Sequence, residues 1–328
     1  MLGRRKYRRY LLAAAVTALA LLAGLSLLPD DKYVRYRQVG GDGQKAGWIY
    51  ERLHFDPEPI DVAFLGTSHT MRAVDAERIE AGLKGVRVAS LAMPYHGQNL
   101  AYVLAKELLA NKKVRLLILE VREIQSRAGH EMFWYLADRE DIVSPVWFFD
   151  PNAITDLAHL PGRQLRLFFR TRFPDAFGEP RAFDPVHYAG HHWSDAAEQL
   201  ETHPREWLEA QHANERRTRS YGALPPSLHP LEFRFSTAYT NRIKALAAAN
   251  GTAVAFLYLP SYSETAPPAD SALYDDLWTP PAGLLAPPER WADLTHLNVA
   301  GASALVPWLI DEIALALARD LPGTADKN

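Results

Sequence analysis

The chain has 328 residues, 48% of them hydrophobic, with 36 Lys and Arg against 39 Asp and Glu, a formal net charge of −3 and no cysteine. This composition is that of a globular protein and excludes a collagen-like, coiled-coil or low-complexity chain. The absence of cysteine excludes disulfides, a thiol nucleophile and thiolate metal sites. Five basic residues precede residue 10, so the remainder is acidic and lacks the basic stripe of a nucleic-acid-binding protein.

The N-terminus has the pattern of a membrane anchor. Residues 1–9 carry the basic cluster, and residues 10–29 have no charge and are long enough to cross a hydrocarbon layer of ~30 Å. Because basic flanks stay cytoplasmic, the pattern predicts a single-pass protein of the inner membrane whose remainder lies in the periplasm or outside. A cleaved signal peptide is the alternative, but the apolar run is longer than a typical signal and ends in no A-x-A site.

The sequence then changes from a polar segment to a regular alternation. Residues 30–55 are weakly periodic and predict a linker. From residue 56, short apolar runs alternate with helical patterns, which predicts β-α-β units with a parallel sheet. The expected strands are Asp61–Gly66, Val86–Leu91, Val114–Val121 and Thr252–Leu259, and the expected helices are Asp75–Leu83, Gln98–Leu109, Ala238–Asn250 and one after Asn298 that Pro307 should kink. The sheet domain therefore comprises residues 56–124 and 236–320, followed by a tail at 321–328.

Residues 125–235 lack this alternation and predict an insertion over the sheet. Its aromatic residues are Trp134, Tyr135, Trp147, Phe148, Phe149, Phe168, Phe169, Trp193 and Trp207. Two interpretations stay open: a helical subdomain that uses the rings as its own core, or a lid whose rings contact a ligand.

Ligands of an open parallel sheet bind beyond the carboxyl ends of its strands, so the segments after the expected strands are candidate site residues. Ser68 follows the first strand within Gly66–Thr70 and is a candidate nucleophile, although a helix-capping serine fits the same place. Gly97 follows the second strand and lets the backbone approach a substrate closely. The N–H groups of Ser68 and Gly97 could together form an oxyanion hole.

A D-x-x-H motif supplies a candidate base. Asp293 and His296 precede the last helix, and this spacing lets one loop present a histidine and the carboxylate that orients it. The same spacing recurs at Asp156/His159 and Asp184/His187, but only Asp293/His296 follows the last expected strand.

The other groups of polar residues in the sequence do not have the pattern of a metal or cofactor site, so we expect no cofactor and no metal. His187, His191 and His192 include a pair at i,i+4 spacing, but no carboxylate at the spacing of a zinc motif accompanies it. Glu120 and Glu123 end the third strand, and residues so close at a strand end rarely face each other, which argues against a glycosidase carboxylate pair.

The three segments in this order resemble the SGNH (GDSL-like) hydrolase superfamily. Together with the anchor, the chain is similar to the branch that acetylates extracellular polysaccharides, such as the alginate O-acetylation proteins. The resemblance implies a three-layer α/β/α sandwich of flavodoxin-like type, with Ser68 as nucleophile, His296 as base and Asp293 as its orienter. It maps the glycine of the second family block onto Gly97.

The third family block departs from the usual pattern. Where the superfamily has an asparagine in a G-x-N-D turn, this chain has Glu120, Val121, Arg122 and Glu123. The third oxyanion donor is then missing, or it is supplied by Arg122 or Asn99.

The resemblance implies acyl transfer through an acyl-serine intermediate, from an acyl donor to a hydroxyl of a polysaccharide acceptor, outside the cytoplasm. It further implies a multispanning membrane acyltransferase as partner. Two alternatives stay open: an esterase that deacetylates a cell-envelope polymer, and a catalytically silent polysaccharide-binding component of an export complex. Water and a sugar hydroxyl compete for the same acyl-enzyme, and the residues do not distinguish transfer from hydrolysis.

Overall fold

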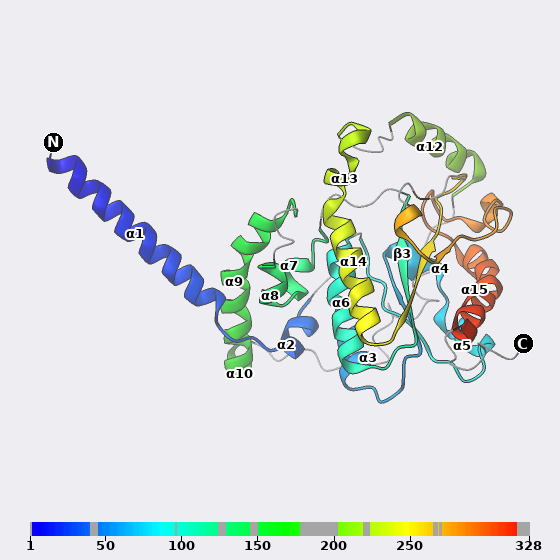
Figure 1. Cartoon of the computed structure of the whole chain (residues 1–328), viewed down its shortest axis with the longest axis horizontal. Helices are drawn as coiled ribbons and strands as arrows, with labels where there is room; N and C mark the ends of the chain where they lie inside the picture. Colours follow the sequence, from blue (N-terminus) through cyan, green and yellow to red (C-terminus); the bar gives the residue numbers. More distant parts are fainter. Residues whose placement is uncertain are drawn as a thin grey trace, which may run out of the picture.

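A computed structural model describes residues 2–39, 45–95, 97–123, 129–144, 150–177, 203–218, 224–264, 268 and 271–319. Within these residues, five parallel strands form one sheet in the order β2-β1-β3-β4-β5 (Figure 1). The strands are β1 (Val62–Leu65), β2 (Val88–Ser90), β3 (Leu116–Val121), β4 (Ala253–Tyr258) and β5 (Leu277–Trp278). The α/β class and the parallel sheet predicted from the alternation are confirmed. This strand order places the switch point of the sheet, where ligands of such folds bind, between β1 and β3.

Helices bury both faces of the sheet. One face is covered by α3 (Lys45–His54), α6 (Gln98–Asn111) and α14 (Arg234–Ala249), and the other by α4 (Ser68–Ala73), α5 (Ala76–Gly82) and α15 (Val299–Arg319). Alternate residues of a strand point to opposite faces. Leu117 and Leu119 of β3 therefore enter the first core, and Leu116 and Ile118 enter the second.

The long periodic segments fold as the sequence predicts, and a very short one was missed. The expected strands are β1 to β4, and the expected helices are α5, α6, α14 and α15, with end positions shifted by a few residues. The helix α15 continues through Pro307. The strand β5 was not predicted because its two residues are too few to show a period, and its place comes from pairing with Phe256 and Leu257 of β4.

The segment 30–55 is part of the folded domain, and its prediction as a linker is corrected. It contains α2 (Lys32–Arg37) and α3, which bury Val34, Tyr36 and Ile49 in the core on the α6 side. Asp31 caps α2 by accepting the Tyr33 N–H at 2.8 Å. Helices of six and ten residues are too short to show a clear amphipathic period in a polar sequence.

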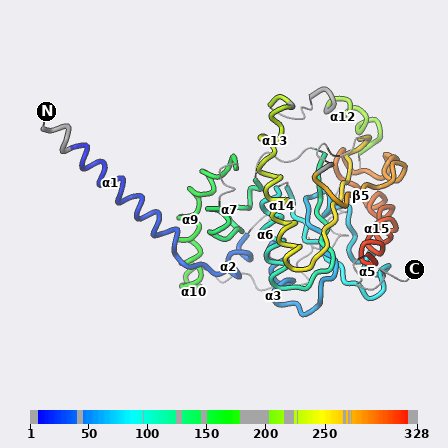
Figure 2. The backbone as a smooth tube through the Cα atoms, viewed as in Figure 1, coloured from blue at the N-terminus to red at the C-terminus, as the bar shows by residue number. Residues whose placement is uncertain are grey.

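The helix α1 (Leu2–Ser26) projects away from the sheet domain (Figure 2). Among the described residues, Tyr7–Ser26 and Val299–Arg319 are the helical stretches long and apolar enough to cross a membrane. The second of these is α15, whose Leu305 and Leu309 are fully buried in the domain core. The apolar surface of α1 has no such cover, so α1 is the candidate for spanning a membrane.

The described parts of the predicted insertion lie in two different places. The helices α7 (Phe133–Leu136), α8 (Arg139–Ile142), α9 (Ala153–Arg172) and α10 (Pro174–Phe177) lie on the side of the domain from which α1 leaves, whereas α12 (Arg205–Thr218) and α13 (His229–Glu232) lie along the top of the view in Figure 1. The short turn η4 (Pro226–Leu228) directly precedes α13. The short turns η5 (Ser271–Leu273) and η6 (Pro288–Arg290) complete the described helical segments. A single lid over the sheet is therefore not what these residues form.

Some of the described aromatic rings of this region pack on protein, whereas Phe169 and Trp207 are more than a third exposed. Phe133 and Tyr135 are buried in the core beside α6, and Trp134 stacks on His159 with ring centroids 4.6 Å apart. Trp207 stacks on His203 at 3.9 Å. Trp147, Phe148, Phe149 and Trp193 lie outside the described residues.

Asp156, in α9, gives the fold a pH dependence. Burial, and then the charge of Asp150, raise the pKa of Asp156 to about 7. The folded state binds this proton more tightly than the unfolded chain, so its stabilising contribution is present below about pH 4 and is lost as the pH rises to 7. We expect Asp156→Asn to raise Tm at pH 8 relative to the parent and to leave Tm at pH 4 nearly unchanged.

Differential scanning fluorimetry between pH 4 and pH 8 measures this difference. The control is Asp175→Asn, since Asp175 is exposed on α10. Parallel Tm curves for the parent and Asp156→Asn over this range would assign the pH dependence to another group.

Candidate active site

Ser68, His296 and Asp293 form one chain of hydrogen bonds. The Ser68 Oγ lies 2.9 Å from Nε2 of His296, and Nδ1 of His296 lies 2.8 Å from Oδ2 of Asp293. Burial alone would raise the pKa of Asp293, but hydrogen bonds from the His296 ring and from the Thr295 N–H hold it well below its usual range. An ionised Asp293 accepts a hydrogen bond from the Nδ1–H of His296. The proton therefore stays on Nδ1, and Nε2 presents its lone pair to the Ser68 hydroxyl. This arrangement allows His296 to remove the serine proton.

The loop that carries the base is held by the same carboxylate. Oδ1 of Asp293 accepts the Thr295 N–H at 2.7 Å, the Thr295 hydroxyl at 3.0 Å and the His296 N–H at 2.8 Å. Just before it, the buried indole of Trp291 donates to the Leu285 carbonyl at 2.8 Å. One oxygen of Asp293 therefore shapes the loop and the other orients the imidazole. The side chain of His296 remains 22% exposed, which leaves the site open to a substrate.

Ser68 is the first residue of α4, directly beyond β1. Thr67, not Ser68, is the N-cap, and its hydroxyl accepts the His69 N–H at 3.2 Å. The Thr70 N–H donates to Glu120 at 3.2 Å. The first N–H groups of a helix have no partner within the helix. These contacts use the N–H groups of His69 and Thr70, so the N–H of Ser68 is the candidate oxyanion donor. The hydroxyl of Ser68 is not needed as a helix cap, because Thr67 has that place.

Glu120, near the end of β3, holds the turn at residues 66–70. This turn carries the candidate nucleophile Ser68 and is called the nucleophile turn below. The carboxylate of Glu120 accepts the Thr67 N–H at 2.7 Å, the Thr67 hydroxyl at 2.8 Å and the Thr70 hydroxyl at 2.6 Å. The guanidinium of Arg122 lies 3.6 Å from it. Burial by itself raises the pKa of Glu120, but the charge of Arg122 and these hydrogen bonds hold it below its usual range. An ionised, fully buried carboxylate therefore ties β3 to the nucleophile turn.

His69 is placed differently from His296, although it adjoins the nucleophile in sequence. Its ring is buried, with its centroid 5.2 Å from that of His296. Burial, and then the charge of Arg122, hold the pKa of His69 well below its usual range, so the ring is neutral.

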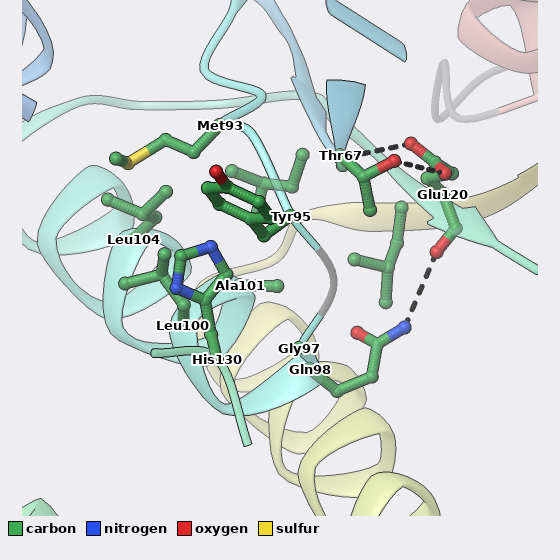
Figure 3. Close-up of a pocket in the computed structure, with 13 residues that line it drawn as sticks. Thr67, Met93, Tyr95, Gly97, Gln98, Leu100, Ala101, Leu104, Glu120 and His130 are labelled. Carbon is green, nitrogen blue, oxygen red and sulfur yellow. Dashed lines mark hydrogen bonds between the residues drawn. The ribbon is translucent and has the colours of Figure 1, made fainter. Parts of the chain in front are cut away.

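A small pocket lies between the nucleophile turn and the start of α6 (Figure 3). Figure 3 shows the rings of Tyr95 and His130 on one side and the Thr67–Glu120 pair on the other. The residues that line it are Leu65, Gly66, Thr67, Met93, Tyr95, Gly97, Gln98, Leu100, Ala101, Leu104, Leu119, Glu120 and His130. Its free volume of about 20 Å³ is enough for about one water molecule.

Two residues give this pocket a fixed wall. The Nε2–H of His130 donates to the Pro94 carbonyl at 2.7 Å, while its Nδ1 accepts the Met132 N–H at 3.0 Å. Tyr95 has a φ of 67°, a left-handed conformation that is uncommon for a residue other than glycine. Such strained residues persist where the surrounding structure holds them, and they cluster at functional sites.

The structure brings one of the three predicted oxyanion residues to the pocket. Gly97 lines it, and a Cβ there would overlap the backbone of His130. Asn99 does not line it, because its Oδ1 accepts the N–H groups of His130 at 2.8 Å and Leu100 at 2.9 Å. Arg122 pairs with Glu120. The contacts of Asn99 Oδ1 hold a loop and Arg122 lies beside a buried charge, so a third donor from Asn99 or Arg122 stays a prediction.

The other constellations do not join this site. Asp156 and His159 lie on α9, and the segment with Asp184, His187, His191 and His192 lies outside the described residues. Glu123 accepts the Ser261 N–H at 2.8 Å. In the part of the chain that the structure describes, no three His, Asp or Glu side chains gather as a metal site.

The network of Thr67, Thr70 and Glu120 was not predicted. Its signal in the sequence is a single carboxylate near the end of an otherwise apolar run, LLILEV at residues 116–121. Because an ionised group is rarely buried without partners, such a residue points to a specific network. The identity of those partners, residues 67 and 70, requires the pairing of β1 with β3.

Gly66 is required by this network. A Cβ at residue 66 would overlap the Thr70 hydroxyl and the Glu120 carboxylate. We expect Gly66→Ala to lower the free energy of unfolding by about 1–3 kcal/mol through overpacking, and to reduce activity by displacing the turn. Urea unfolding measures it, with Gly162→Ala as control because nothing lies within 4 Å of a Cβ there. Equal stability of the two variants would contradict the overlap.

Sequence comparisons assign no family to the chain. No protein-family model matches it, and no curated protein matches its sequence. The function is therefore inferred from the motifs and from the geometry of Ser68, His296 and Asp293.

Proposed function

We propose that this protein is a serine acyltransferase that passes an O-acetyl group to a hydroxyl of a cell-envelope or extracellular polysaccharide. The observation that carries the proposal is the hydrogen-bonded series Ser68, His296 and Asp293 at the edge of a parallel sheet. The strand order and the helices on both faces support an SGNH-like α/β/α sandwich of three layers.

The chemistry has two halves that share an acyl-enzyme. In the first, His296 Nε2 takes the Ser68 proton while Oγ attacks the acyl carbonyl, and the oxyanion accepts the N–H groups of Ser68 and Gly97. As the carbonyl reforms, the leaving group departs with the proton from His296, which leaves acyl-Ser68. In the second half, the acceptor hydroxyl gives its proton to His296 and attacks the ester. Collapse of this intermediate releases the acetylated sugar, and Ser68 takes the proton back.

The size of the pocket supports a short acyl group. It adjoins the nucleophile turn through Gly66 and Thr67, and its free volume is about 20 Å³. That space suits a group near the size of a methyl, such as that of an acetyl donor, although neither Ser68 nor His296 lines the pocket.

The N-terminal helix supports a membrane-anchored location. Tyr7–Ser26 is exposed and apolar from residue 10 onward, and the five basic residues of the chain's start lie before residue 10. Under the positive-inside rule, the sheet domain then lies on the periplasmic side. There the acyl donor has to be delivered across the membrane, which is the role of a multispanning acyltransferase partner.

A serine-reactive fluorophosphonate tests the nucleophile. The full chain in detergent should be labelled at Ser68, and Ser68→Ala should not be labelled. Ser90→Ala is the matched control, because Ser90 ends β2 at the same edge of the sheet. Labelling of Ser68→Ala at the parental rate would exclude Ser68 as nucleophile. A folded parent that is not labelled would favour the silent polysaccharide-binding alternative.

Partition of the acyl-enzyme separates transfer from hydrolysis. With an aryl acetate as donor, a transferase should form an acetylated oligosaccharide, and release of the phenol should rise with acceptor concentration. An esterase would release acetate at a rate independent of the acceptor.

A further inference from the structure

Large apolar side chains lie exposed on α9 and α10. Phe169 is 39% exposed, Phe173 50% and Phe177 51%. They recur every fourth residue, and the Phe169 ring lies 5.9 Å from that of Phe173 and 5.7 Å from that of Phe177. These residues, called the phenylalanine face below, form one cluster. Contiguous aromatic surface of this kind marks an interaction site in a soluble domain.

Arginines surround the phenylalanine face. Residues 157–177 contain four arginines, at positions 163, 166, 170 and 172, and one acid, Asp175. Arg166 and Arg172 are exposed, whereas Arg163 is buried and donates to the Ala137 carbonyl at 2.8 Å. A helix with exposed aromatic and cationic side chains has the composition that binds at the interface of an anionic bilayer.

The phenylalanine face begins on α9, the helix that contacts the end of α1, and continues into α10. The carboxamide of Gln164 donates to the Leu28 carbonyl at 2.8 Å and to Asp30 Oδ1 at 3.1 Å. The buried guanidinium of Arg35 lies 3.2 Å from Asp30 and donates to the Ala137 carbonyl at 2.7 Å. Figures 1 and 2 both show α1 leaving the domain beside α9. The point where the chain leaves α1 is therefore fixed to α9 and not joined to it by a free linker.

We propose that the phenylalanine face, with Arg166 and Arg172, docks on the surface of the bilayer that α1 crosses. This inference rests on the proposed anchoring through α1. Because Leu28 is bonded to Gln164, a membrane that ends near residue 28 brings α9 to its surface. The rings then enter the boundary between headgroups and acyl chains, and the two guanidinium groups bind lipid phosphates. Attachment at both α1 and α9 sets the orientation of the sheet, and of Ser68 at its edge, relative to the membrane.

The test uses the absence of cysteine from the chain. Single variants of the full chain, Phe173→Cys, Leu231→Cys and Leu12→Cys, carry a small environment-sensitive fluorophore in nanodiscs of phosphatidylcholine with phosphatidylglycerol. Leu231 is the control, since it is 58% exposed on α13. Leu12 reports on α1. We expect lipids with a nitroxide near the headgroup to quench the probe at residue 173, and aqueous iodide to quench the probe at residue 231.

Three outcomes would overturn the proposal, and they are distinguishable. Equal iodide quenching at residues 173 and 231, with lipid quenching at residue 12, would remove the docking and leave the anchor. Absence of lipid quenching at residue 12 would remove the anchor and the docking together. Protection of residue 173 in native membranes but not in nanodiscs would assign the face to a protein partner.

A charge series tests the arginines separately. In the Phe173→Cys background, Arg166→Gln and Arg172→Gln should each lower the ratio of docked to undocked protein about fivefold, as expected for one cation at an anionic surface. Nanodiscs of phosphatidylcholine alone should abolish that difference. Equal docking of parent and variants on the anionic lipid would show that the arginines do not bind phosphate.

Discussion

Ser68→Ala and His296→Ala should each lower turnover by on the order of 10⁴- to 10⁶-fold, with little change in Tm. In the proposed mechanism, Ser68 Oγ is the atom that becomes acylated, and His296, whose Nε2 lies 2.9 Å from it, is the base. Neither side chain is part of the hydrophobic core, because both are partly exposed. Release of phenol from an aryl acetate, followed alongside thermal unfolding, measures both quantities.

The losses of turnover caused by Ser68→Ala and His296→Ala should not multiply when the two changes are combined. The double variant Ser68→Ala/His296→Ala should be no slower than either single variant, because the base has no task without the nucleophile. Asp293→Asn should lower turnover by about 10⁴-fold, because an amide does not favour the tautomer that leaves Nε2 free to accept. Losses that multiply in the double variant would contradict a shared catalytic unit.

Glu120→Ala should lower both stability and turnover. The change leaves donors of Thr67 and Thr70 and the charge of Arg122 without their buried carboxylate. Removal of one partner from a buried pair costs about 3–5 kcal/mol. Displacement of the nucleophile turn by about 1 Å can reduce turnover on the order of 10²-fold. Urea unfolding and the rate of fluorophosphonate labelling of Ser68 measure the two effects.

Glu120→Gln and Glu123→Gln separate positioning from general destabilisation. The glutamine at residue 120 keeps the shape but offers one accepting oxygen, so it should recover part of the stability while labelling of Ser68 stays slow. Glu123 lies at the same strand end and holds Ser261 instead, so Glu123→Gln should label at the parental rate. Equal labelling rates for Glu120→Gln and Glu123→Gln would show that Glu120 has no positioning role.

Glu120 also lies in the segment where the resemblance to the SGNH superfamily predicts an asparagine. In this chain the end of β3 supplies a carboxylate to the nucleophile turn, and Arg122 balances its charge. The proposed oxyanion hole therefore consists of backbone N–H groups, those of Ser68 and Gly97. A chain with this arrangement depends on the rigidity of the turn more than on a third side-chain donor.

The long periodic elements could be read from the sequence because their patterns are local. The alternation of apolar runs with helical patterns predicts the strands β1, β3 and β4. Their side chains are buried on both faces of the sheet. The helices α2 and α3 give no clear helical pattern in the sequence because each is short and rich in polar residues. Their burial depends on contacts with α6 and α9, which lie far along the chain.

Residue types and their order along the chain were enough to nominate Ser68, Asp293 and His296, because parallel strands present their following loops at one edge. Only the folded chain decided that Ser68 and His296 lie 2.9 Å apart, that Thr67 is the cap, and that Asn99 Oδ1 accepts the His130 N–H. Motifs record chemistry within a few residues, whereas distances between loops depend on strand pairing and core packing across the whole domain. The buried network of Glu120 belongs to that second kind of information, since its partners come from two strands joined in the sheet.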